Sequence, residues 1–345
     1  MSNDDEPADT MRERAEKPSW LLYLLLDADR WRITGLLSAG LFLTLVAVGV
    51  AHPVPAQALV TAADPVETLF QALITGIITA VTLVLTLSQL VLSQELGAAG
   101  DQRDRMAGAI EFRDAVADAV GTPISPAEPS AFLRSLVTTT GDQARALEDA
   151  LDGERLDAEL TDLLSTYTDS ITGNADTVAD QLEGAEFGEF DVVRTALNYN
   201  YSWKLYAGRR IKARYADQLP EAAVDALDAL TETLSLFGPA REHFKTLYFQ
   251  WELSNLSRTL LYISLPALTA AISTLLFLNP RDFAGLTLGI ANSLLLVSAL
   301  VTIALLPFVV LLSYILRIVT VTKRTLSIGP FILRKTDRPV DVEWE

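Results

Sequence analysis

Residues 68–94 have the sequence TLFQALITGIITAVTLVLTLSQLVLSQ, which contains no charged residue. A helix rises about 1.5 Å per residue, so about 20 apolar residues cross the roughly 30 Å hydrocarbon layer of a bilayer. Only helices and closed barrels satisfy their backbone polar groups in that layer, and an unbroken apolar run lacks the alternation of a barrel strand. The stretch therefore predicts a membrane-spanning helix.

Three further stretches share this character, and they are residues 33–51, 259–279 and 286–316. The first has charged residues before it and no cleavage-like site after it, so we expect it to be retained and not removed as a signal peptide. Residues 20–26, just before it, are apolar and aromatic but too short to span, which favours a helix in the membrane interface. Because apolar residues are concentrated in these stretches, the chain has a positive mean hydropathy of +0.28 although its net charge is −17.

The distribution of basic residues predicts the orientation of the four spans. Residues 52–67 contain no Lys or Arg, and the loop between the last two spans contains only Arg281. The opposite flanks carry Arg and Lys, which are enriched on the cytoplasmic side of membranes. We therefore expect both termini on the cytoplasmic side of the cell membrane. The predicted fold is an all-α integral membrane protein, with four transmembrane helices in two hairpins and a helical cytoplasmic domain inserted between spans 2 and 3.

Five segments follow from these assignments. They are a cytoplasmic N-terminal segment with an interfacial helix (1–32), transmembrane hairpin 1 (33–95), an acidic helical cytoplasmic domain (96–256), transmembrane hairpin 2 (257–318) and a basic cytoplasmic tail (319–345). Apolar residues of the domain recur at helical spacing, and its Gly and Pro residues divide it into five or six helices. The expected breaks are at 97–100, 121–129, 184–188, 220 and 238–239.

The domain is strongly acidic in its first part, where residues 101–191 hold 21 acidic and 6 basic residues. A surface that stays solvated at high salt explains this excess. Binding of divalent cations is the alternative, although the twelve-residue spacing of a calcium loop is missing. The chain has no cysteine and only two histidines, and it shows no phosphate-binding loop or nucleophile motif. We therefore expect no metal centre, no cofactor and no enzymatic activity.

The second predicted span carries a stripe of polar residues. Its members are Thr75, Thr79, Thr82, Thr86, Gln89 and Ser93. Their spacings alternate between four and three, so the stripe follows one helical face for about 27 Å. In one interpretation the hydroxyl groups let helices pack closely and bond across the interface. In the other, several copies turn this face to a common axis and line a water-filled path, which requires a homo-oligomer.

Aromatic and basic residues are mixed within residues 198–215. Tyr199, Trp203, Tyr206 and Arg210 follow one another at spacings of four, three and four, and they are candidates for contact with lipid headgroups. An amphipathic helix packed on its neighbour explains the same spacing. We do not expect nucleic acid as a partner, because the net charge of the chain is strongly negative.

The segment from Ser88 to Gly97, SQLVLSQELG, and the preference for Arg over Lys, 21 to 6, resemble multi-span membrane proteins of halophilic archaea that have no assigned activity. The resemblance implies no catalytic residue. Two hypotheses remain for this protein of the lipid bilayer. It is an oligomeric, passive channel-like protein whose second span lines the path, or it is a non-conducting anchor or sensor that presents the acidic domain to a cytoplasmic protein partner.

Overall fold

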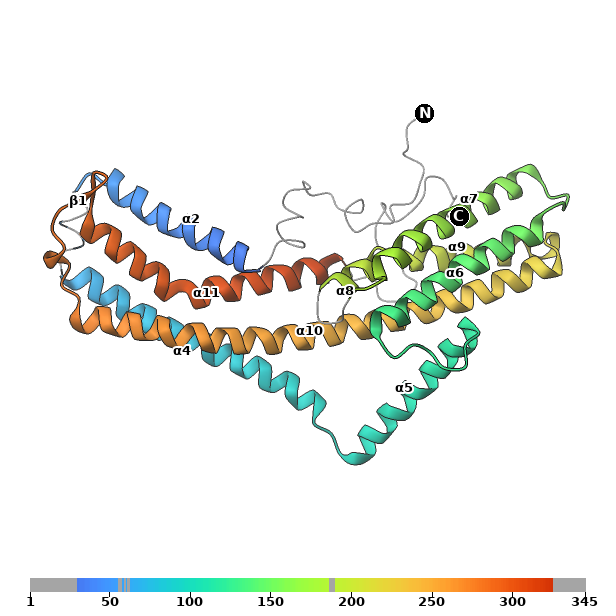
Figure 1. Ribbon diagram of the computed structural model, residues 1–345, viewed down its shortest axis with the longest axis horizontal. Coiled ribbons are helices and arrows are strands. Elements are labelled where there is room, and N and C mark those ends of the chain that lie inside the picture. Colours follow the sequence, from blue (N-terminus) through green and yellow to red (C-terminus); the bar gives the residue numbers. More distant parts are fainter. Residues whose placement is uncertain (1–29, 55–57, 59, 61–62, 186–189, 325–345) are drawn as a thin grey trace. The chain divides into compact units, whose positions relative to one another are not determined.

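The computed structural model describes residues 30–54, 58, 60, 63–185 and 190–324, and these residues are almost entirely helical (Figure 1). Four of the helices are long and apolar enough to cross a membrane. The chain divides into two compact units. The span unit comprises the described residues of 19–96 and 250–321, and the insert unit comprises those of 97–249 and 322–324. The predicted interfacial helix at 20–26 and residues 325–345 of the predicted tail lie outside the described residues.

The span unit is built from four helical segments. They are α2 (Arg30–Ala51), α4 (Ala63–Glu95), the last part of α10 (Glu221–Phe277) and α11 (Asn292–Arg324). Each contains most of one charge-free run, as expected of sequences whose Leu, Ile, Val and Ala residues continue without a run of turn-forming residues.

Apolar side chains fill the space between these helices. One cluster includes Phe70 of α4, Ala267 of α10 and Val301 of α11, and a second includes Val84, Leu260 and Tyr314 from the same three helices. Alanines at the contacts let the backbones approach closely, which is the usual basis of helix association in a bilayer.

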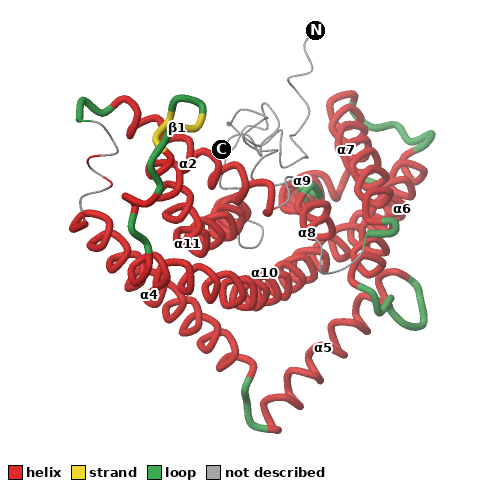
Figure 2. The backbone as a smooth tube through the Cα atoms, turned by 60° about the vertical axis from the view of Figure 1, so that its left-hand side comes forward, coloured by secondary structure: helices red, strands yellow, loops and turns green. Residues whose placement is uncertain are grey.

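A short hairpin replaces the start of the predicted fourth span. After a 3₁₀ turn (Pro280–Asp282), the strands β1 (Leu286–Thr287) and β2 (Ile290–Ala291) pair antiparallel, and Figure 2 shows them as the yellow segment. Gly289 takes a φ of 79° in the turn between them, a conformation that glycine adopts without steric cost. The apolar run was therefore predicted wrongly at its start, because the helix begins at Asn292 and not at Leu286.

The insert unit is helical throughout its described residues. It contains α5 (Ala99–Val120), α6 (Pro129–Leu151), α7 (Ala158–Leu182), α8 (Phe190–Leu197), α9 (Tyr201–Tyr215), the 3₁₀ turn Ala216–Gln218 and the first part of α10. Leu136, Leu164, Tyr167, Leu230 and Phe237 lie in one continuous core and are almost completely buried. The breaks predicted at 97–100, 121–129 and 220 coincide with helix boundaries and are confirmed. Of the break predicted at 184–188, Gly184 and Ala185 follow the end of α7, and residues 186–188 lie outside the described residues.

The break predicted at Gly238-Pro239 is wrong, because α10 continues through it. A Cβ atom at Gly238 would lie 2.7 Å from the ring of Tyr201. The glycine therefore permits a close approach of α9 to α10 instead of ending the helix.

Candidate functional site

The polar stripe of α4 lies on the outer surface of the span unit. All six of its members are exposed. The opposite side of the helix is buried, with Phe70, Ile77 and Val84 each exposed by 6% or less. These three residues follow a seven-residue spacing, so α4 turns an apolar face into its own bundle and a polar face away from it.

The hydroxyl groups of the stripe are hydrogen-bonded within α4. Thr79 donates to the carbonyl oxygen of Thr75 at 2.8 Å, and Thr82 and Thr86 donate to the carbonyl four residues earlier at 2.9 Å each. Such a bond satisfies the hydroxyl proton and leaves the oxygen able to accept from another donor. Gln89 differs, because its amide makes no hydrogen bond to any other residue that the structure describes.

Other hydroxyl groups join the helices of the span unit. Ser88 of α4 is hydrogen-bonded to Ser257 of α10, and Thr34 of α2 donates to Ser313 of α11 at 3.3 Å. Bonds across helix interfaces of this kind were one interpretation of the stripe. Within a single copy they involve Ser88, which lies on the buried side of α4, and none of the described bonds of the stripe crosses to another helix.

Large apolar side chains cover much of the remaining outer surface of the span unit. They are exposed in each of its four helices, and examples are Leu43, Leu83, Leu265, Phe277 and Phe308. An apolar surface of this extent is unusual for a protein surrounded by water and is typical of one that faces lipid. The stripe is thus a polar strip on an otherwise largely apolar surface.

An ion pair between a half-buried arginine and a buried glutamate joins two helices of the span unit. Arg30, at the start of α2, donates from Nη2 to Oε2 of Glu252 at 2.5 Å, and Glu252 is completely buried on α10. The guanidinium of Arg30 also lies 4.5 Å from the ring centre of Tyr314 on α11. Removal of Arg30 would be strongly destabilising, since it would leave the charge of Glu252 buried without its partner. The sequence signal was the position of both charges just outside the apolar runs, and it was missed because their pairing is not visible along the chain.

The candidates for headgroup contact separate into two pairs. Tyr199 and Trp203 are 0% and 6% exposed and belong to the core of the insert unit, so neither side chain is available to a lipid. Tyr206 and Arg210 are half-buried. Helix α9 begins at Tyr201, so Tyr199 lies before it and the spacing that linked the four residues does not describe one helical face. Internal packing accounts for Tyr199 and Trp203.

Some of the aromatic and basic residues of this region contact one another inside the insert unit. Lys204 is completely buried, and its ammonium lies 5.4 Å from the ring centre of Tyr199 and 5.9 Å from that of Trp203. Arg241 of α10 stacks over Tyr201 at 4.7 Å. Cation–π contacts of this kind stabilise buried cations. These contacts lie inside the insert unit and favour internal packing, which was one of the two interpretations of the sequence.

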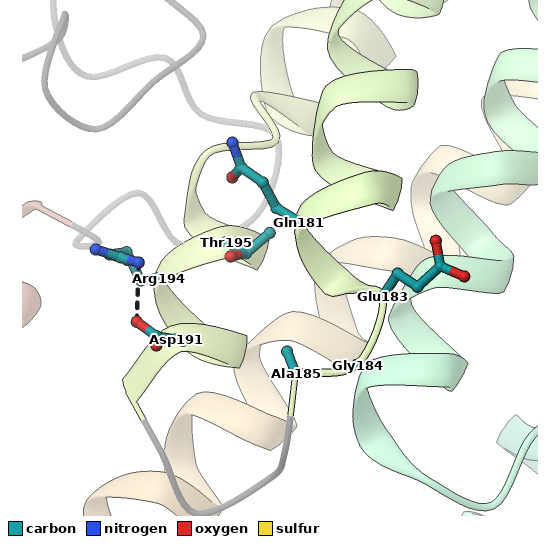
Figure 3. Close-up of a pocket in the computed structure, with 7 residues that line it drawn as sticks. All are labelled: Gln181, Glu183, Gly184, Ala185, Asp191, Arg194 and Thr195. Carbon is teal, nitrogen blue, oxygen red and sulfur yellow. Dashed lines mark ion pairs between the residues drawn. The ribbon is translucent and has the colours of Figure 1, made fainter.

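A polar hollow lies between the end of α7 and α8 (Figure 3). Its lining consists of Gln181, Glu183, Gly184, Ala185, Asp191, Arg194 and Thr195. Asp191 and Arg194 form an ion pair at 2.9 Å, so these two charges of the hollow neutralise each other. None of these residues was a predicted site residue, and they present no nucleophile beside a base.

Acidic residues of the insert unit do not converge on one point. Within the described residues no group of three or more His, Asp or Glu side chains is arranged to hold a metal ion. Arg145 instead pairs with Asp176 across α6 and α7 at 2.7 Å, and the hydrogen bond and charge of Asp176 raise the pKa of Arg145 above its ordinary value. Such exposed pairs contribute little to stability.

Comparison with known proteins gives a family and no activity. No curated protein and no solved structure matches the chain. One family model matches over residues 1–345. The chain therefore belongs to a family of unknown function, DUF7972.

Proposed function

We propose that this protein is a homo-oligomeric, multi-pass protein of the cell membrane, in which the α4 stripes of several copies face one another and line a passive, hydrated path. In this proposal the four spans form two hairpins, and both termini and the insert unit are cytoplasmic. The bilayer and further copies of the chain are its partners, and it has no catalytic role.

The observation that supports this proposal is the direction of the stripe. Apolar side chains such as Phe70, Ile77 and Ala271 fill the interior of the span unit, so one copy has no room for a hydrated path. The polar face points away from that interior. A path between copies uses the face that each copy leaves uncovered.

The free-energy cost of placing polar groups in hydrocarbon favours a polar environment for the stripe. An unpaired amide in hydrocarbon costs several kcal/mol, because no solvent there can bond to it. Gln89 is exposed, and so are Leu85 and Leu92, which are its neighbours on the surface of the helix. Water in a path, or the same residue of a second copy, removes that cost. The threonine oxygens, which retain accepting capacity, can line the same path with neutral dipoles, a pattern that favours weak selectivity between ions.

Conductance of the protein in liposomes at high salt tests the proposal. We expect ion flux from the native protein and its loss in Thr82→Leu and Gln89→Leu, since each substitution replaces a path-lining dipole with an apolar side chain. Leu87→Ile, at an exposed position of α4 outside the stripe, is the matched control and retains flux. Absence of flux from folded native protein over a range of salts and voltages contradicts the proposal.

A second candidate function is a non-conducting anchor or sensor that presents the insert unit to a cytoplasmic protein. The observation that favours it is the extensive core of the insert unit, which is larger than a simple linker needs. Because the chain contains no cysteine, Thr82→Cys supplies a single thiol that separates the two. The thiol reacts with a water-soluble reagent in a conducting oligomer and is inert where the stripe is buried in a dry interface.

A further inference from the structure

Helix α5 differs along its length in how it is packed. Its second half joins the core of the insert unit through Phe112, Val116 and Val120. Every residue of 99–111 is exposed, and these include Met106 at 63% and Ile110 at 51%. The first half of α5 therefore exposes two large apolar side chains.

The exposed half of α5 has an apolar face on one side and a charged face on the other. Ala99, Arg103, Met106 and Ile110 follow one another at spacings of four, three and four, so they share one face. Asp101, Asp104 and Glu111 lie on the opposite side of the helix. A helix with an apolar face opposite a charged one can lie in a membrane interface with its apolar face inserted.

The covalent chain holds this segment near the end of a candidate span. Helix α4 ends at Glu95 and α5 begins at Ala99. Three connecting residues reach at most about 10–14 Å even when fully extended, and Met106 lies about 10 Å further along the helix at 1.5 Å per residue. A tether this short gives a high effective concentration of the helix at the bilayer surface, so a small apolar face suffices to dock it.

We propose that residues 99–110 of α5 lie along the inner leaflet of the bilayer, with Met106 and Ile110 inserted at the level of the headgroups and acyl chains. Leu96, which is exposed in the connection, extends the inserted surface. Arg103 reaches from the same face to the headgroups, since arginine keeps its charge in water while its aliphatic stem stays in the apolar layer. The acidic face points to the cytoplasm. The proposal rests on α4 crossing the membrane with its C-terminal end on the cytoplasmic side, and it is independent of conduction.

Single cysteines with nitroxide spin labels test this arrangement, because the chain contains no native thiol. The labels are placed at Met106 and Ile110, and at Asp104 and Glu111 as matched controls on the opposite face. The full chain is reconstituted in vesicles of phosphatidylcholine and phosphatidylglycerol. We expect the ratio of oxygen to nickel-complex accessibility to be severalfold higher at Met106 and Ile110 than at Asp104 and Glu111, because oxygen concentrates in lipid and the nickel complex in water.

A label at Leu83 of α4 distinguishes failure of this proposal from failure of the membrane assignment. If Leu83 is lipid-exposed while Met106 and Asp104 are equally water-accessible, α5 is free in solution and the proposal is overturned. If Met106 is shielded from both oxygen and the nickel complex, a protein covers the face and the proposal is also overturned. Water accessibility at Leu83 itself overturns the spanning arrangement and, with it, the docking of α5.

Discussion

At the scale of single residues, Tyr167 is the titratable group that the fold constrains most clearly. It is almost completely buried, and its hydroxyl donates to the carbonyl oxygen of Lys204 at 2.9 Å. Burial, with a smaller effect from the neighbouring Tyr199, raises the pKa of Tyr167 above its ordinary value. The phenol therefore stays protonated in the folded insert unit at a pH where it ionises in the unfolded chain.

This difference predicts alkaline sensitivity. The unfolded tyrosine has a pKa of about 10, so the stabilising effect is complete below about pH 10 and is lost as the pH rises further, by up to about 1.4 kcal/mol per pH unit. Tyr167→Phe removes one hydrogen bond and should cost about 1 kcal/mol at pH 8. Between pH 10 and 11, the free energy of unfolding of the Tyr167→Phe variant should decrease less steeply than that of the native protein. Urea unfolding followed by circular dichroism measures both slopes, and equal slopes contradict the assignment.

At the scale of elements, two glycines in helix interiors predict opposite effects of the same substitution. Gly173 of α7 is exposed, and a Cβ atom there meets nothing within 4 Å. Gly173→Ala should stabilise the insert unit by about 0.5–1 kcal/mol, since alanine is the better helix former. Gly238→Ala should destabilise it by about 1–3 kcal/mol, because the added methyl collides with the Tyr201 ring. Thermal unfolding of both variants checks the prediction, and stabilisation by Gly238→Ala would contradict the observed packing.

The same glycine shows where sequence reasoning succeeds for helices and where it fails. Breaks such as 121–129 were predicted correctly, because several turn-forming residues occur together and the apolar periodicity stops. Gly238-Pro239 also consists of residues typical of turns, but it interrupts no periodicity. Its glycine is required by a tyrosine 37 positions earlier (238 − 201 = 37). Such a contact depends on tertiary packing and leaves no signal within a local window.

The sequence predicted part of the candidate site as well, and it left the contacts of that site undetermined. Periodicity placed Thr75 to Ser93 on one face of one helix, and charge-free length made that helix a candidate span. Periodicity does not determine what a face contacts, so only the packing of α4 against α10 and α11 showed that the stripe points away from its own bundle. The pairing of Arg30 with Glu252 was unpredictable for the same reason, since it joins positions far apart in the sequence.

At the scale of the whole molecule, the two units have separate cores although α10 contributes to both. The buried α10 residues of the insert cluster end at Ala240, with half-buried Phe244 packed against them, and those of the span clusters begin at Leu256, with half-buried Leu253 packed against them. A continuous helix couples two cores weakly, because each backbone hydrogen bond spans only four residues and one part of a helix can melt while another persists. Separate cores therefore predict two unfolding transitions instead of one.

Leu136→Ala tests this independence. Leu136 is completely buried in the insert unit, so its truncation should cost about 2–5 kcal/mol and lower the midpoint of one thermal transition by roughly 5–15 °C. Val84→Ala, at a position 1% exposed in the span unit, is the matched substitution and should lower only the other midpoint. Calorimetry of the full chain in vesicles resolves the two. If each substitution moved both midpoints equally, α10 would join the units into one cooperative structure, and a change in the insert unit would then be felt directly at the stripe on α4.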